Sequence, residues 1–163
     1  MIEDLELWSD FNVAMAGATA ALAGLVIVAA SVNIGEIVKA RALTARLAAG
    51  IAALVLAIVA SALGLVPRIS PLWFGVLLLA AAAGAAILQV QATRAIFADH
   101  HPAARAKLPK SVFGFLPIVA YAAGALVVLA GGPSGLYLVA TGSVLAIVTG
   151  IVVSWVALVE VLR

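Results

Sequence analysis

Cysteine is absent from this 163-residue chain, and charged and aromatic residues are scarce. Without cysteine the chain has no disulfide, no thiolate metal site and no cysteine nucleophile. Charged residues make up 10% of the sequence and aromatic residues 6%, whereas hydrophobic residues make up 66%. Soluble domains contain about 25% charged and about 45–50% apolar residues. The composition therefore argues against an ordinary soluble domain and indicates a chain that resides in lipid.

Four segments contain no charged residue, and together they cover 120 of the 163 residues. They are residues 11–35, 47–67, 69–93 and 111–159. A helix needs about 20 apolar residues to cross the ~30 Å hydrocarbon core of a bilayer. Each of the three shorter segments is therefore one span long. The last segment has 49 residues and contains the turn-forming sequence Gly-Gly-Pro-Ser-Gly at 131–135, so it predicts two spans.

We therefore predict an all-α integral membrane helical bundle that forms a single transmembrane domain, residues 1–163. The five transmembrane helices are expected at about 11–34, 43–65, 71–93, 112–130 and 136–162. Ser9 and Asp10 are expected to cap the first of them. Pro117 lies inside the fourth helix. A helix beginning at Pro117 would be only about 22 Å long at 1.5 Å per residue, so we expect the helix to continue through this proline with a kink.

Basic residues are distributed unevenly between the two ends of the predicted helices. Eight of the nine Lys and Arg residues lie in the connections 1–2 and 3–4 or at the C-terminus, and only Arg68 lies at the opposite end. Lys and Arg accumulate on the cytoplasmic side of membrane helices. The asymmetry predicts an outside N-terminus and a cytoplasmic C-terminus, in the inner membrane of a bacterium. It also accounts for the net charge of +2, so we expect the lipid bilayer, and no nucleic acid, as partner.

Three basic residues of the connection between the third and fourth helices are suited to contact anionic lipid headgroups. They are Arg105, Lys107 and Lys110.

Small residues recur at every fourth position of the last helix, at Gly142, Ala146, Gly150 and Ser154. Residues four apart lie on one ridge of a helix, and in lipid such ridges allow two helices to approach closely. Two interpretations are open. The ridge packs the helices of one subunit, or it forms an interface between the subunits of a homo-oligomer.

Polar residues are few inside the predicted spans, and no ionisable residue lies at mid-membrane. Intramembrane ionisable groups mark proton relays and ion-coupled transport, so their absence disfavours such mechanisms. A pore lined by small residues, hydroxyls and carbonyls remains open. If the first helix lies on the axis of an oligomer, its pore candidates are Asp10, Asn12, Thr19 and Asn33. Their plainer explanations are helix-end roles and, for Thr19, a hydrogen bond back to its own helix.

The remaining polar residues within the spans are Ser61, Gln89, Gln91, Thr141, Ser143, Thr149 and Ser154. For the hydroxyl side chains among them we expect hydrogen bonds to carbonyls of their own helices.

Catalytic motifs are missing from the sequence. It contains no G-x-S-x-G, no H-E-x-x-H, no phosphate-binding glycine-rich loop and no pair of carboxylates within a span. We therefore expect no enzymatic activity, no cofactor and no metal site. The leading hypothesis is an oligomeric channel or pore for ions or small solutes. The alternative is a non-conducting accessory or scaffold protein that binds another membrane protein.

The segment Phe11–Val26, followed by Ser31-Val32-Asn33, resembles the first helix of a family of small, uncharacterised bacterial membrane proteins with several spans. The resemblance lies mainly in this helix. It implies a membrane location and no particular activity.

Overall fold

The structure is a computed structural model that describes residues 2–39, 41–98 and 107–161, with side chains for 5–39, 41–98 and 111–155. All regular secondary structure in these residues is α-helical. The helices are α1 (Ile2–Leu7), α2 (Ser9–Val32), α3 (Ile34–Lys39), α4 (Arg41–Gly64), α5 (Pro71–Ala98), α6 (Lys107–Leu129) and α7 (Gly135–Val161).

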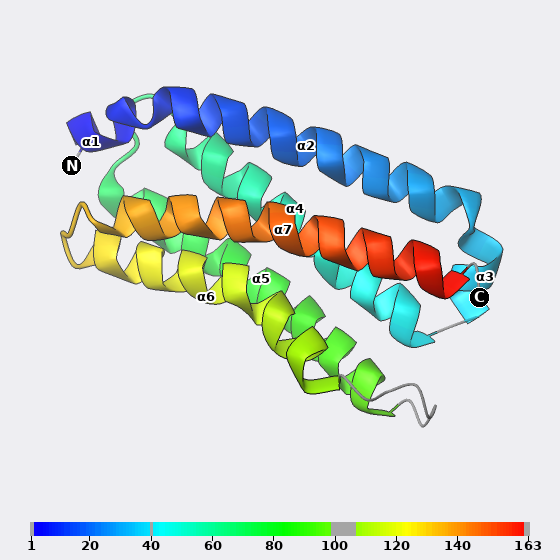
Figure 1. Cartoon of the computed structure of the whole chain (residues 1–163). Helices are drawn as coiled ribbons and strands as arrows, with labels where there is room; N and C mark the ends of the chain where they lie inside the picture. The colour runs from blue at the N-terminus through cyan, green and yellow to red at the C-terminus, as the bar shows by residue number, and fades with distance from the viewer. Residues whose placement is uncertain (1, 40, 99–106, 162–163) are drawn as a thin grey trace.

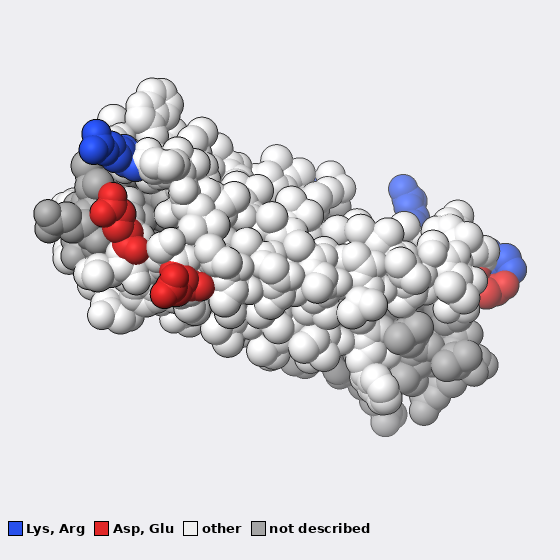
Figure 2. Space-filling model, turned by 90° about the horizontal axis from the view of Figure 1, so that it is seen from above, with Lys and Arg blue, Asp and Glu red and all other residues white. Residues whose placement is uncertain are grey.

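Within the described residues, five helices are long and apolar enough to cross a membrane, namely α2, α4, α5, α6 and α7. The predicted set of five membrane helices is thus confirmed, and the chain is a multi-pass membrane protein. Figure 2 shows that the charged side chains on one face gather at the two ends of the molecule and leave the middle band free of charge. A protein surface in contact with the hydrocarbon core of a bilayer must carry almost no charge, and this band meets that requirement.

The long helices run alongside one another between two ends (Figure 1). The first, called the α1 end, holds α1 and the turns at 65–70 and 130–134. The second, called the α3 end, holds α3, the starts of α4 and α6, and the ends of α5 and α7. Among the described positions, Arg68 is the one basic residue at the α1 end. The described basic positions at the α3 end are Lys39, Arg41, Arg46, Arg94, Lys107 and Lys110.

Helix α4 is the centre of the bundle and contacts each of the other four long helices. Its apolar stretch is 56% buried, whereas that of α2 is only 17% buried. Helix α2 packs mainly on α4 and less extensively on α7. It therefore lies at the edge of the bundle, and most of its surface faces outward.

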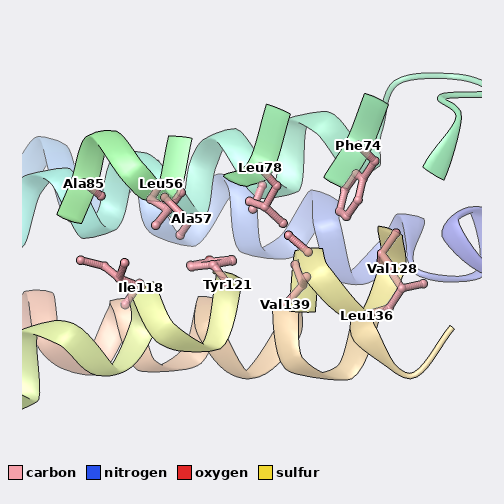
Figure 3. Close-up of a cluster of buried hydrophobic side chains, with 14 of the residues drawn as sticks. Leu56, Ala57, Phe74, Leu78, Ala85, Ile118, Tyr121, Val128, Leu136 and Val139 are labelled. Carbon is pink, nitrogen blue, oxygen red and sulfur yellow. The ribbon is translucent and has the colours of Figure 1, made fainter. Parts of the chain in front are cut away.

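Large apolar side chains fill the interior toward the α1 end. Phe74 and Leu78 of α5 face Tyr121 and Val128 of α6 in a cluster that α4 and α7 complete (Figure 3). Leu5 of α1 is buried against the same cluster. Close packing of this kind contributes stability through many small dispersion contacts. The short helix α1 thus covers the end of the core.

The start of α2 differs from the prediction, and the predicted caps are wrong. Ser9 and Asp10 lie inside the first turn of α2, whose N-cap position is held by Trp8 without a side-chain hydrogen bond. The Trp8 carbonyl accepts the Asn12 N–H at 2.9 Å. No separate signal for α1 is present in the sequence, because its six residues are too few for a helical pattern to stand out.

Helices α5 and α6 also extend beyond the expected spans, to Ala98 and back to Lys107. Charged residues mark where the membrane ends, but a helix continues past that point into water. Helix α6 runs through Pro117 without interruption, as expected, and the kink expected at this proline stays a prediction.

Candidate functional site

A cavity of about 70 Å³ lies between α4, α5, α6 and α7 in the half of the bundle nearer the α3 end. Helices α5 and α6 lean away from α7 toward this end (Figure 1). Each of the four helices contributes a polar or minimal side chain to the lining: Arg46 from α4, Gln89 from α5, Gly114 from α6 and Thr149 from α7. A cavity of this size holds more than one water-sized molecule.

Gln89 lies on the buried face of α5, on a stripe with Ala82, Ala85 and Ala92. Its side chain is only 6% exposed, and its Nε2 donates a hydrogen bond to the Ser111 carbonyl of α6 at 3.4 Å. These small neighbours let α6 approach, and the amide joins the two helices beside the cavity.

Two further features of the α5–α6 contact hold the Gln89 amide in place. The hydroxyls of Thr93 and Ser111 are hydrogen-bonded at 2.7 Å, one turn beyond Gln89 on α5. On α6, a Cβ at Gly114 would overlap the amide of Gln89. A glycine at this position therefore leaves the space that the amide occupies.

Thr149 is the polar residue whose bonding differs from expectation. The predicted hydrogen bond to the same helix is confirmed for Thr19, Thr141, Ser143 and Ser154, with oxygen–oxygen distances of 2.6, 2.8, 3.3 and 2.7 Å. Thr149 is only 3% exposed, and its Oγ1 has no hydrogen-bond partner among the described residues. An unpaired buried hydroxyl costs about 1–3 kcal/mol. Thr149 is also among the residues that line the cavity.

Arg46 is the one charged residue among the described residues that line the cavity. Arg46 is half-buried on its wall, and it makes a further interaction within the protein. None of the described residues that line the cavity is Asp or Glu. In the part of the chain that the structure describes, no group of three or more His, Asp or Glu side chains is placed to hold a metal ion.

The ridge of small residues on α7 faces other helices of the same chain. A Cβ at Gly142 would lie 3.0 Å from the ring of Tyr121 in α6, and one at Gly150 would lie 3.0 Å from Leu54 of α4. Ala146, between them, has no exposed surface. Ser154, the last residue of the ridge, donates a hydrogen bond to the Gly150 carbonyl. Gly142 and Gly150 thus have packing partners within one subunit, and the role of the ridge in an oligomer stays a prediction.

The four pore candidates of α2 are not brought together on one face. Asn12 and Thr19 are buried on the side that packs on α4, and Asn12 lies against Gly64. Asp10 is exposed. Asn33 follows the last residue of α2, and its Nδ2 donates to the Ala29 carbonyl at 3.5 Å.

The outward face of α2 instead carries small residues in a seven-residue pattern. Ala14, Gly17, Ala21 and Gly24 are all exposed. A Cβ added at Gly17 or Gly24 would meet no atom within 4 Å.

The side chains of the three residues predicted to contact lipid headgroups are not among those that the structure describes. Arg105 lies outside the described residues, and Lys107 and Lys110 lie in the first turn of α6, where only the backbone is described.

Sequence reasoning identified Gln89 and Thr149 as polar residues within spans but did not bring them together. They lie on different helices, and the spacing along the chain carries no signal for their shared cavity. The signal that was available is the presence of an amide and a hydroxyl in otherwise apolar segments.

Comparison with protein-family models, with curated proteins and with solved structures gives no match for this chain.

Proposed function

We propose that this chain forms a homo-oligomeric membrane channel or pore for ions or small solutes. The solute binds in the cavity between α4, α5, α6 and α7. The observation that carries the proposal is the meeting of polar residues from three helices at one cavity, among them the buried Thr149. Polar groups inside a membrane bundle are costly and mark solute pathways. Here an amide, a hydroxyl and a guanidinium from three helices line one small space.

The apolar packing of the α1 half is, in this proposal, the closed gate. Phe74, Leu78 and Tyr121 have at most 1% exposed surface and fill the interior beyond the cavity. Apolar constrictions block permeation because they exclude water. Conduction then requires α5 and α6 to shift against α4 and α7 at this level.

We place the α3 end in the cytoplasm of a bacterial cell and the N-terminus outside its inner membrane. The excess of basic residues at the α3 end supports this orientation. For the contact between subunits we favour the outward face of α2, because exposed small residues such as Gly17 and Gly24 allow close helix packing in lipid.

A flux assay tests the proposal. Liposomes that contain the purified protein are expected to pass a small ion or neutral solute faster than protein-free liposomes. Thr149→Val keeps the shape of the side chain and removes the hydroxyl, so it should change the flux about three- to tenfold, in line with the loss of one hydrogen bond.

Thr141→Val is the matched control for this assay. Thr141 lies on the same helix, is exposed, and bonds to its own backbone. Its replacement should leave the flux unchanged. Absence of any flux above protein-free liposomes, under every gradient and voltage applied, would count decisively against a channel.

A non-conducting accessory protein is the second candidate. The closed packing around Tyr121 favours it, since the described cluster there consists of buried hydrophobic residues and Tyr121 is hydrogen-bonded to Ser143. In that case the protein should copurify with another membrane protein in fixed stoichiometry and should pass no solute.

A further inference from the structure

We propose that the outward face of α2 in one copy of the chain packs into a groove between α4 and α5 of the next copy, so that identical contacts join the copies into a ring. This inference rests on the proposed homo-oligomer, since it names the two surfaces that join its subunits. It follows from the shape of the two surfaces, from their level in the membrane and from the charges at one end of each.

The first surface, called the α4–α5 groove, is a hollow of about 620 Å³ on the outside of the bundle. Small residues of both helices line it, among them Ala52 and Gly84, together with larger ones such as Val55 and Leu88. Val55 is 46% exposed and Leu88 39% exposed, and every described lining residue is apolar. Small residues let a further helix approach the backbones of α4 and α5 closely in lipid.

The second surface, called the α2 stripe, consists of Ala14, Gly17, Ala21 and Gly24, which are all exposed. Thr19 is buried on the side of α2 that packs on α4. Ala21 is two residues from Thr19, so the stripe lies about half a turn from that side and faces away from α4. Helix α2 runs along the edge of the bundle (Figure 1), and its stripe has room for another helix.

The stripe and the groove lie at the same level in the membrane. Asn12 of α2 lies against Gly64 of α4, and the two helices run in opposite directions (Figure 1). Ala21 lies nine residues after Asn12. Val55, on the groove, lies nine residues before Gly64, so Ala21 and Val55 are about level when each helix rises 1.5 Å per residue. Rotation about an axis along the membrane normal preserves this level, and head-to-tail contacts of this kind close into rings.

Opposite charges lie at the α1 end of the two surfaces. Asp10 is exposed and continues the α2 stripe four residues before Ala14. Arg68 is exposed in the turn that joins α4 to α5, at the α1 end of the groove. The stripe of one copy therefore brings its Asp10 toward Arg68 of the next copy. An exposed ion pair contributes only about 0–1 kcal/mol, so these charges set the register of the contact and the apolar packing supplies its affinity.

The same charge argues against direct packing of the α2 stripe on the α2 stripe of a second copy. In a dimer with its axis along the membrane normal, the two Asp10 carboxylates would lie at one level. Like charges brought together in this way repel each other. The groove, with Arg68 at its end, is therefore the better partner for the stripe.

Disulfide formation between introduced cysteines tests the contact, because the natural chain contains none. The test variant carries Ala21→Cys and Val55→Cys and is oxidised with copper phenanthroline in liposomes. Position 21 faces away from α4, so the two cysteines of one chain do not meet. We expect a ladder of dimers, trimers and larger species on a non-reducing gel. Each single variant should give about tenfold less product, since cysteines more than about 7 Å apart cannot be bridged.

Ala21→Cys combined with Ala62→Cys is the matched control. Ala62 is exposed, and it lies on the same side of α4 as Val55 but two turns, or about 10 Å, nearer the α1 end. This pair should also give about tenfold less product than the test pair, because the cysteines are out of level.

Gly17→Leu gives a second measurement that needs no cysteine. A Cβ at Gly17 meets no atom within 4 Å, so the single subunit should fold. The leucine side chain would keep the groove of the next copy at a distance. We expect the molecular mass of the oligomer in detergent, measured by light scattering, to fall at least about twofold, toward that of one chain. An unchanged mass would overturn the contact.

The remaining outcomes decide between the alternatives. Strong dimer formation by Ala21→Cys alone would show that α2 packs on α2 and would overturn the contact with the groove. No cross-linking of the test pair would also overturn it and would leave the groove to lipid chains. Flux without the ladder would overturn the contact and leave the proposed channel intact. The ladder in a protein that passes no solute would support the contact and overturn the channel.

Discussion

Replacing Tyr121 with alanine is expected to lower the free energy of unfolding by about 3–5 kcal/mol, the cost of truncating a fully buried aromatic side chain. Tyr121 has no exposed surface and stands at the centre of the apolar cluster. Its ring packs on Gly142 of α7, and its hydroxyl is hydrogen-bonded to Ser143 Oγ at 2.9 Å. The surrounding helices cannot close the space, because α4, α5 and α7 all pack around it. Unfolding in mixed micelles with increasing sodium dodecyl sulfate measures the change.

Two variants separate the parts of this effect. Tyr121→Phe keeps the ring and removes only the hydroxyl, so it should cost about 0.5–1.5 kcal/mol. Tyr137→Ala truncates a tyrosine that is 67% exposed and touches only the ring of Trp8 in the aromatic contacts described. Its cost should stay below about 1.5 kcal/mol. Equal losses for Tyr121→Ala and Tyr137→Ala would show that Tyr121 is not in the core.

Replacing Gly124 with alanine should destabilise the protein by about 2–3 kcal/mol, although alanine is the better helix former. Helices α6 and α7 approach each other closely here. A Cβ at Gly124 would lie 2.8 Å from the Gly135 carbonyl oxygen, and one at Gly135 would lie 2.5 Å from the Gly124 carbonyl oxygen. Backbone atoms cannot rotate aside as a side chain can, so the two helices must separate. The same denaturant titration gives the size of the loss.

Gly84→Ala is the matched control for this contact. Gly84 also lies inside a membrane helix, but a Cβ there would meet no atom within 4 Å. Its replacement should leave the stability unchanged or raise it slightly, since glycine lowers helix propensity by about 1 kcal/mol. If Gly124→Ala lowered the free energy of unfolding no more than Gly84→Ala does, the close approach of α6 and α7 at Gly124 would be contradicted.

The five membrane helices were predictable because the cost of placing charge in lipid dominates every other term. The charge-free runs, together with the Gly-Gly-Pro-Ser-Gly turn that divides the last of them, locate α2, α4, α5, α6 and α7. The ends of α5 and α6 were not predictable in this way, since Arg94 and Lys110 mark the membrane boundary and not the end of a helix. Helix α1 was not predicted from the sequence for another reason. Its one buried side chain of known position, Leu5, is defined by contacts with distant parts of the chain.

The candidate site shows where a single sequence stops being informative. Gln89 and Thr149 stand out as polar residues in apolar helices. The sequence does not reveal which hydroxyl groups are hydrogen-bonded to the backbone of their own helix. Thr141 and Thr149 are the same residue type on the same helix, eight positions apart, and only Thr141 bonds to its own backbone. The difference arises from the side of α7 that each one occupies, and so from the packing of four helices.

In the proposed channel, a polar cavity accessible to water reaches Thr149 from the α3 end. Because the chain contains no cysteine, a single introduced cysteine reports its own environment without background. Sulfonatoethyl methanethiosulfonate, a small anion that does not cross membranes, serves as the probe. Lys39→Cys, exposed at the α3 end, identifies the side of the membrane from which the probe must act.

We predict that Thr149→Cys reacts with the probe added from the side on which Lys39→Cys reacts, and not from the opposite side. Ser143→Cys, six residues nearer the α1 end of the same helix and not among the residues that line the cavity, should stay unreactive from both sides. An unreactive Thr149→Cys in a folded protein, or equal reactivity at positions 143 and 149, would contradict the cavity.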